Sequence, residues 1–302
     1  MKPFSLILLV LLHFQVDAQD SVSNDSIFLI KQNDILDAYN NRKKTLLVSE
    51  ISAYAISLFA LDQLWYSGYP RSKFHFINDN KEWLQMDKVG HMTTTYYTGV
   101  AGIKAYKWAG FKRNEAIWYG GITGSVFLMI IEILDGTSKE WGASSGDLLA
   151  NTAGSLLAIG QELKWNQQKI QLKYSYSPSR WAKINPQQLG YNHLERSLKD
   201  YNGQTYWVSF NVNSTFNISQ YDFPNWLNLA LGYGADGMTS PYTDDYQQSN
   251  RQFLMSFDID LSKIKTKSKT LNSVLNLFGF LKFPAPAIQF TNNNFLFHSI
   301  YF

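Results

Sequence analysis

Cysteine is absent from the 302-residue chain, and charged residues are scarce. Without cysteine no disulfide can form and no lipid can be attached to a cysteine thiol, so an exported form must hold its fold by packing alone. Charged residues make up 17% of the sequence, below the usual quarter. The net charge is +3 and no long run of Lys and Arg occurs, which argues against nucleic-acid binding.

The common catalytic signatures are missing as well. The sequence has no P-loop, no GxGxxG after a strand, no GxSxG elbow and no HExxH. It also lacks the phosphatase combination of a Ser-Gly-His turn with Arg-x-x-x-x-x-His. Any chemistry must therefore come from side chains that the fold assembles from separate segments.

Apolar and aromatic residues are plentiful by contrast. The hydrophobic share is 45%, and the chain holds 18 Tyr, 20 Phe and 9 Trp. Because Trp and Tyr favour the boundary between lipid and water, this composition is typical of a protein that meets both. Membrane lipid or other envelope components are the expected partners.

The first 18 residues have the pattern of a secretory signal peptide. Lys2 supplies the positive charge, Phe4 to Leu12 form the apolar core, and Ala18 precedes the expected cleavage site. An uncleaved membrane anchor is the alternative, although the apolar core is short for a span. A polar leader follows at 19–40.

Four apolar stretches with helical spacing predict a helical bundle over residues 41–165. From residue 170 the period changes from 3.6 to 2, which indicates amphipathic strands in an antiparallel β-rich region over 168–302. The fold class is therefore α+β. The expected helices span about 45–66, 85–109, 113–134 and 145–164, with a further short helix at 269–281.

Six or so strands are expected in the β-rich region. The clearest segments read IQLKYSYS, TYWVSFNV, WLNLALGYG, RQFLMSFDIDL and NFLFHSIYF, and Pro284 and Pro286 are assigned to turns. Two arrangements stay open. The strands resemble those of outer-membrane barrels, but we favour a sheet that packs its apolar face on the helices.

Ionisable and amide side chains recur at one end of three predicted helices. Offsets of 4, 7 and 11 residues keep such side chains on one helical face, and an up-down arrangement would bring the three ends together. A buried charge is costly unless it is paired, so Lys88 and His91 are expected to neutralise the carboxylates. The predicted polar cluster consists of Asp87, Lys88, His91, Glu132, Asp135, Asp147 and Asn151.

This polar cluster has a structural and a chemical interpretation. It could fix the register of the helices, or a histidine beside several carboxylates could perform acid–base chemistry or hold an oxygen-preferring cation. The catalytic candidates would be His91, Asp87, Glu132 and Asp147. One histidine among carboxylates is a poor zinc site, so we predict no metal and no cofactor, and favour the structural role.

Three phrases carry a resemblance to a known family. DKVGH at 87–91, EILDG at 132–136 and WGASSGDLLANTAGSLL at 141–157 resemble the YfiM-like predicted periplasmic lipoproteins, a bacterial domain of unknown function. The order of these residues is also similar, more distantly, to VanZ-like membrane proteins. The phrases KDYNGQTYW and FPNWLNLALGYGADGM look like longer members from Bacteroidetes-type bacteria.

The resemblance implies an envelope location, a helical core and the seven positions of the polar cluster, but no reaction. The chain departs from the family because it has no cysteine near residue 19 for a lipid anchor. We therefore predict an exported, membrane-associated envelope protein, in the periplasm or at the outer membrane, with a structural or scaffolding role. The alternative is a membrane hydrolase or phosphatase-like enzyme acting on a lipid or cell-wall precursor, and an ion-holding scaffold is a third class.

Overall fold

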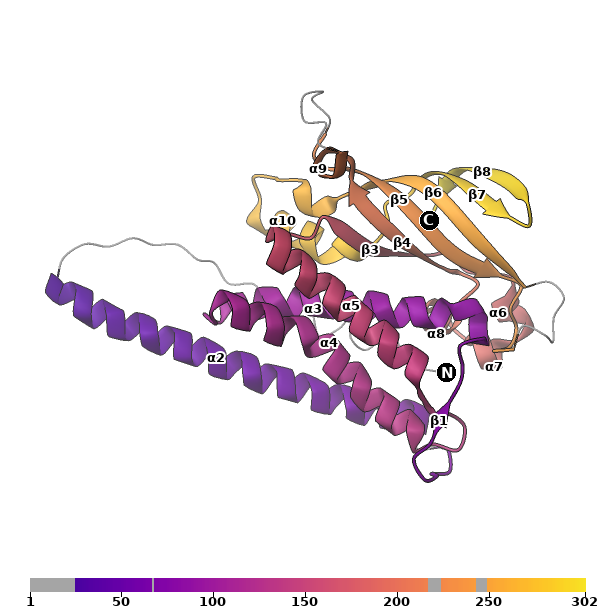
Figure 1. The fold of residues 1–302 in the computed structure, drawn as a ribbon, viewed down its shortest axis with the longest axis horizontal. Coiled ribbons are helices and arrows are strands. Elements are labelled where there is room, and N and C mark those ends of the chain that lie inside the picture. The colour runs from indigo at the N-terminus through magenta and orange to yellow at the C-terminus, as the bar shows by residue number, and fades with distance from the viewer. Residues whose placement is uncertain (1–24, 67, 217–223, 243–248) are drawn as a thin grey trace.

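The computed structural model describes residues 25–302 except 67, 217–223 and 243–248. The predicted signal peptide lies outside these residues. The fold is α+β, with a helical part followed by a six-stranded antiparallel sheet (Figure 1). The main helices are α2 (Asp25–Leu61), α3 (Met86–Trp108), α4 (Arg113–Gly136) and α5 (Ser145–Trp165).

The three later helices lie within a few residues of the predicted bounds and pack on one another. The first helix differs, because α2 begins at Asp25 and includes the described part of the polar leader. It packs on the others through a few side chains, such as Leu46 beside Tyr106 and Tyr54 beside Phe127. The helical part is therefore three mutually packed helices with α2 along their side, rather than the bundle of four helices expected.

Glycine allows the close packing of the three helices. A Cβ at Gly120 of α4 would lie 2.4 Å from the backbone of Gly102 in α3, and one at Gly154 of α5 would lie 2.1 Å from the carbonyl oxygen of Met92. No side chain fits at such distances. At the start of α5, the Ser144 hydroxyl accepts a hydrogen bond from the Asp147 N–H and so caps the helix.

The sheet is a meander in which each strand pairs with the next one along the chain. Its edges are the first and last strands. The predicted strands are present, and β7 is an additional one in a segment that was assigned to turns. The strands are β3 (Ile170–Tyr176), β4 (Gln204–Asn211), β5 (Leu227–Asp236), β6 (Asn250–Ile259), β7 (Ala285–Thr291) and β8 (Asn294–Tyr301).

The outer face of the sheet is apolar, as the period-2 pattern predicted. One row of paired residues across all six strands consists of Leu172, Val208, Leu231, Met255, Ile288 and Phe297. At the β3 end this face packs on the helices, where Leu172 joins Tyr96 and Ile159 in a buried group. Toward β8 it is open, and Phe297 is 72% exposed. The apolar face thus covers the helices only in part.

The inner face is polar and buried, which the sequence did not predict. Lys173 and Ser209 are fully buried, and the Lys173 ammonium lies 2.7 Å from Asp258 Oδ2. The sheet curls over this face, because Tyr301 of β8 reaches β4 and its hydroxyl lies 2.9 Å from the hydroxyl of Thr205. The paired charges are therefore held between strands of the same sheet.

The remaining helical segments connect the strands. They are α6 (Trp181–Ile184), α7 (Pro186–Leu189), α8 (His193–Lys199), α9 (Val212–Phe216) and α10 (Lys269–Leu277). The short helix predicted at 269–281 is formed by α10 and a following 3-10 turn, Phe278–Phe280. A two-stranded parallel pair, β1 (Phe76–Ile77) and β2 (Ala143–Ser144), joins the loop before α3 to the start of α5.

A left-handed turn leads into α3. Trp83, Leu84 and Gln85 all have positive φ, between 49° and 64°. Because this conformation costs about 1–2 kcal/mol per non-glycine residue, contacts from elsewhere must hold it. The Trp83 N–H donates to the carbonyl oxygen of Pro241, and the Tyr233 hydroxyl donates to that of Leu84. The sheet side of the molecule therefore fixes the entry into α3.

Candidate functional site

The polar cluster lies where three helix ends meet. Asp87, Lys88 and His91 are in the first turns of α3, Glu132 and Asp135 in the last turns of α4, and Asp147 and Asn151 in the first turns of α5. All seven are buried except Lys88, which is partly buried. The structure thus places these side chains at the same end of the bundle.

Lys88 is the positive centre of the cluster. Its ammonium lies 2.7 Å from Asp79 Oδ1, 3.1 Å from Asp147 Oδ1 and 3.6 Å from Asp87 Oδ2. Burial by itself would lower the pKa of Lys88, but the surrounding carboxylates outweigh burial and raise the pKa above its ordinary value. Lys88 therefore carries its charge throughout the neutral range. Asp79 is a member of this group that sequence reasoning missed.

His91 joins α3 to α5. Its Nδ1 lies 3.0 Å from Asn151 Oδ1, and because that oxygen can only accept, Nδ1 is the donor. Its Nε2 then faces Asp87 Oδ1 at 3.7 Å. A hydrogen bond that holds the ring in this way is what an acid–base histidine needs. The ring is only 2% exposed, however, so it is closed off from solvent.

Glu132 and Asp135 make different contacts from those expected. The Ser144 N–H donates to Glu132 Oε2 at 2.8 Å, and the Tyr66 hydroxyl donates to Asp135 Oδ1 at 2.8 Å. The predicted counter-charges for these carboxylates were Lys88 and His91, and the ion pairs of Lys88 involve other partners. Backbone and phenol donors thus contribute to the stability of the acidic end of α4.

Ser144 connects the loop before α3 with Glu132 and Asp147. Its hydroxyl donates to Asp79 Oδ1 and accepts from the Asp147 N–H. Pairing of β2 with β1 places Ser144 opposite Ile77, two residues before Asp79. The short parallel pair therefore brings Asp79 to Lys88, although no helical periodicity marks that loop in the sequence.

The sheet side also reaches the cluster. The Tyr201 hydroxyl donates a 2.8 Å hydrogen bond to Asp87 Oδ1, and both residues are buried. Burial raises the pKa of the Tyr201 phenol well above its ordinary value, and the negative charge of Asp87 adds to this effect. Tyr201 lies in a phrase that the family resemblance had marked, but nothing in its spacing linked it to Asp87.

A metal ion fits this arrangement poorly. Among the described residues, Asp87, His91 and Asp147 offer ligand atoms within 4.8 Å of one another. The ammonium of Lys88 already lies beside both of these carboxylates, and a divalent cation there would be repelled at short range. Lysine therefore supplies the positive charge that the carboxylates require.

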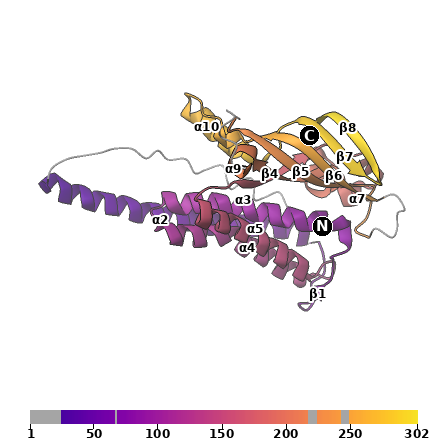
Figure 2. The same cartoon turned by 45° about the horizontal axis from the view of Figure 1, so that its top comes forward.

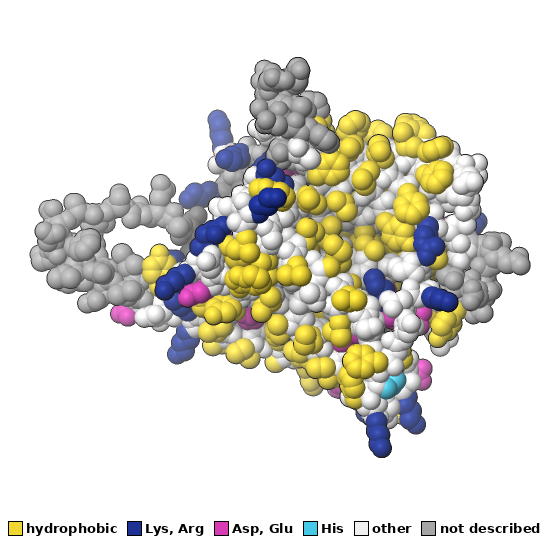
Figure 3. Space-filling model, viewed as in Figure 1, with side chains coloured by type: hydrophobic (Ala, Val, Ile, Leu, Met, Phe, Trp, Pro, Cys, Tyr) yellow, Lys and Arg dark blue, Asp and Glu magenta, His cyan; other side chains and the backbone are white. Residues whose placement is uncertain are grey.

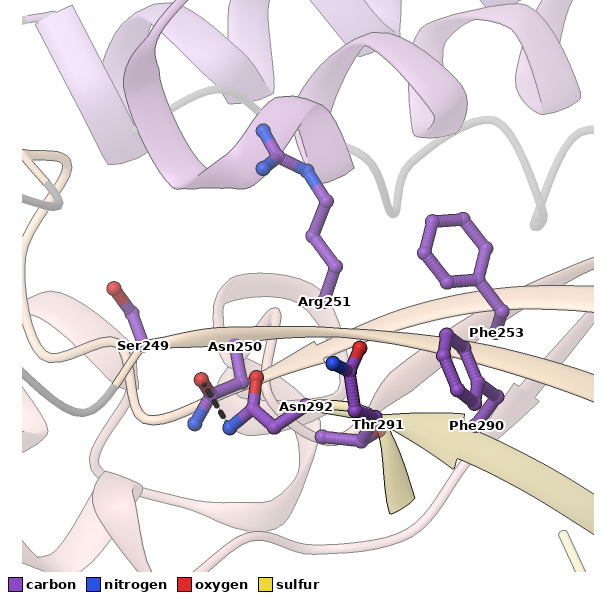
Figure 4. A pocket seen from close by; sticks show the side chains of 8 residues that line it. Ser249, Asn250, Arg251, Phe253, Phe290, Thr291 and Asn292 are labelled. Atoms are coloured by element: carbon purple, nitrogen blue, oxygen red, sulfur yellow. Dashed lines mark hydrogen bonds between the residues drawn. The ribbon is translucent and has the colours of Figure 1, made fainter. Parts of the chain in front are cut away.

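A separate hollow lies at the end of the sheet. It has a volume of about 340 Å³ and is lined by residues of β6, the end of β7 and the β7–β8 turn, including Asn250, Phe253 and Phe290 (Figure 4). Arg251 extends from it toward the helices, where its guanidinium donates to Gln85 Oε1 at 2.7 Å. This contact holds the left-handed turn, and none of the lining residues belongs to the polar cluster.

Comparison with known proteins finds one family that matches part of the chain. Residues 75–161 match a family described as a predicted periplasmic lipoprotein, DUF2279. No curated protein and no solved structure matches the chain. The matched segment includes the whole polar cluster and stops before the sheet. It supports the predicted resemblance to periplasmic lipoproteins and a place in the bacterial envelope, and it does not extend to the VanZ-like resemblance.

Proposed function

We propose that the protein is an exported envelope protein that contacts a membrane through the outward side of α4, and that the polar cluster is a structural element rather than a catalytic one. The main support for the membrane contact is the exposed apolar surface of α4. Trp118, Ile122, Val126, Met129 and Ile133 are exposed along that helix, and no charged residue occurs from 116 to 131.

The pattern on α4 suits lipid better than water. Among the described residues, α4 is the helix that is long and apolar enough to cross a membrane, and half of its apolar stretch is buried. The neighbouring helix α5 also carries exposed apolar side chains, since Leu149 is 72% and Leu156 52% exposed. Hydrophobic side chains lie over both the helices and the sheet in Figure 3. A surface of this extent marks a contact with lipid or another protein.

The burial of the cluster favours its structural role. Asp147 is fully buried and His91 is 2% exposed, so a substrate could reach them only if the surrounding elements moved. Lys88 and the donors from Ser144 and Tyr201 already stabilise the carboxylates. The hydrolase alternative is supported by the short distance between His91 and Asp87, with Asp147 nearby. In that alternative Glu132 would have a structural role, because it accepts a hydrogen bond from the Ser144 N–H.

Membrane fractionation tests the proposed contact. Membranes of an expressing strain, with inner and outer membranes separated, are extracted with carbonate. We expect the chain to remain in the membrane pellet and Ile122→Asp with Val126→Asp to shift it to the supernatant, because a charge on a lipid-facing surface is costly. Asn114→Asp, an exposed position on the same helix, is the matched control. Recovery of the unaltered chain in the soluble periplasmic fraction would refute the proposal.

A second experiment tests the role of the cluster. His91→Ala and Glu132→Gln are expected to lower thermal stability in proportion to any loss of cellular function. Loss of a cellular phenotype at unchanged fold and abundance would instead favour the hydrolase alternative.

A further inference from the structure

The connection between β6 and β7 contains an amphipathic helix that projects from one end of the sheet. This helix, α10, follows a 3-10 turn at Leu261–Lys263 and continues into a second one at Phe278–Phe280 (Figures 1 and 2). Every residue of α10 is described and none is buried. Core packing therefore does not account for its apolar side.

The apolar side of α10 is continuous and open. Leu271, Val274 and Phe278 follow one another at helical spacing, and each is more than 40% exposed. Phe283, shortly beyond the helix, is exposed as well. The opposite side carries Thr and Asn residues. Such a separation of apolar and polar sides on a surface helix is typical of an element that lies in the interface of a bilayer.

The charges around α10 have one sign. Lys263, Lys265, Lys267 and Lys269 alternate with other residues and are all exposed, and no Asp or Glu occurs from 262 to 302. The lysines precede or begin the helix, where the helix dipole disfavours positive charge. Helix stability therefore does not explain them, whereas attraction to an anionic surface does.

The lysine-bearing loop is tied to the helix. Asn272 Oδ1 accepts from the N–H of Thr266 at 2.7 Å and from its hydroxyl at 2.8 Å, and Asn272 Nδ2 donates to the Thr266 carbonyl at 3.0 Å. The Ser268 hydroxyl caps the helix by accepting from the Leu271 N–H. The positive charges are therefore held close to one end of the apolar side.

We propose that residues 263–283 bind the surface of a bilayer with anionic headgroups. The apolar side of α10 enters the boundary between headgroups and acyl chains, and the lysines contact headgroup phosphates. A second copy of this chain is a less suitable occupant, because the segment would bring like charges together. The inference shares with the proposed function only the premise that the protein meets a bilayer, and it adds a preference for anionic lipid.

The absence of cysteine allows a site-specific test. In the purified full chain, Val274→Cys is labelled with an environment-sensitive dye and mixed with vesicles of phosphatidylcholine, with or without phosphatidylglycerol. We expect a blue shift and quenching by lipid-borne quenchers mainly with phosphatidylglycerol. Replacing the four lysines with Gln should weaken binding at least about tenfold, and added salt should do the same. Gln at Lys112, Lys139, Lys164 and Lys183, which are also exposed, is the matched control.

Three outcomes would overturn the inference. They are no response at residue 274, an equal response in neutral and anionic vesicles, and a concentration-dependent response without vesicles, which would indicate self-association. Val126→Cys on α4, labelled in the same way, separates this inference from the proposed function. A response at 126 without one at 274 would refute only the role of α10, and the reverse would refute only the α4 contact. Circular dichroism confirms that each variant is folded.

Discussion

Tyr201 and Asp87 are 114 residues apart in the chain and share a buried hydrogen bond of 2.8 Å. Tyr201 precedes β4 and Asp87 lies in the first turn of α3, so this bond joins the sheet to the polar cluster. The ring of Tyr201 also contacts that of Trp83, at 5.3 Å between centroids. The cluster is therefore completed by a residue outside the helices that form most of it.

Removing the Tyr201 hydroxyl should destabilise the fold. Tyr201→Phe leaves a buried carboxylate without one of its donors, and we expect the free energy of unfolding to fall by about 1–3 kcal/mol. Urea unfolding followed by far-UV circular dichroism measures the change. Tyr191→Phe, at a position that is 65% exposed, should have almost no effect. Equal effects of the two substitutions would contradict the role given to this bond.

Lys88 should be the residue on which the cluster depends most. Lys88→Met leaves Asp79, Asp87 and Asp147 without their shared cation, and breaking such a pair costs about 3–5 kcal/mol. Since the pKa of Lys88 is raised in the folded state, its contribution is present at all pH values below its unfolded pKa of about 10.4 and is lost as pH rises through the folded pKa. Thermal melting at neutral pH measures the loss.

Two further variants refine the test of Lys88. Adding Asp147→Asn to Lys88→Met should restore part of the stability, because one uncompensated charge is removed. Lys112→Met, at an exposed position, should leave the melting temperature unchanged. A Lys88→Met protein as stable as the original chain would show that the carboxylates are neutralised in another way.

Two glycines of α5 should respond in opposite directions to the same substitution. A Cβ at Gly154 would lie 2.1 Å from the Met92 carbonyl oxygen, whereas nothing lies within 4 Å of a Cβ at Gly160. Gly154→Ala should therefore destabilise by about 1–3 kcal/mol through overpacking. Gly160→Ala should stabilise by about 0.5–1 kcal/mol, because alanine favours a helix. Chemical denaturation of both variants measures the difference, and a shared sign would contradict the close approach of α3 and α5.

Lys282 should make the stability of the fold depend on pH in the alkaline range. Burial, together with the nearby Lys173, lowers the pKa of Lys282 to about 8, although Asp258 opposes this. The folded state then releases the proton before the unfolded state does, so stability should rise between pH 8 and about 10.4, the unfolded value. Lys282→Met should flatten that rise, as measured by melting temperatures across the pH range. Lys183→Met, at an exposed position, should leave the pH profile unchanged.

Helical periodicity predicted α3, α4, α5 and their meeting point because each helix carries its polar groups on one face. It could not predict Asp79 or Tyr201, whose positions depend on strand pairing and on the path of the chain between β3 and β4. The donors from the Ser144 backbone to Glu132 and from the Tyr66 phenol to Asp135 were missed for a similar reason, since backbone and phenol donors have no charge pattern in a sequence. Residue types alone therefore predicted where the cluster lies but not which hydrogen bonds and ion pairs its members make.

The strands show a different limit. Alternation identified β3 to β6 and β8, but it cannot tell which face of a sheet is covered. The polar face is buried because the sheet curls on itself, and that curl depends on distant contacts such as Tyr301 with Thr205. Pro286 was assigned to a turn, yet it lies in β7 beside a shift of register between Ala285 and Ala287, where a proline is tolerated.

The left-handed turn at Trp83, Leu84 and Gln85 has a practical consequence. An excised fragment covering only the family-matched segment would lose Tyr233, Pro241 and Arg251, which hold this turn. Without those contacts, the three residues would gain about 1–2 kcal/mol each by reverting to right-handed backbone, which would change the path of the chain into α3 even though Lys88 and Ser144 still bind Asp79. Glycine at these positions would lower the cost of the left-handed turn in such a fragment.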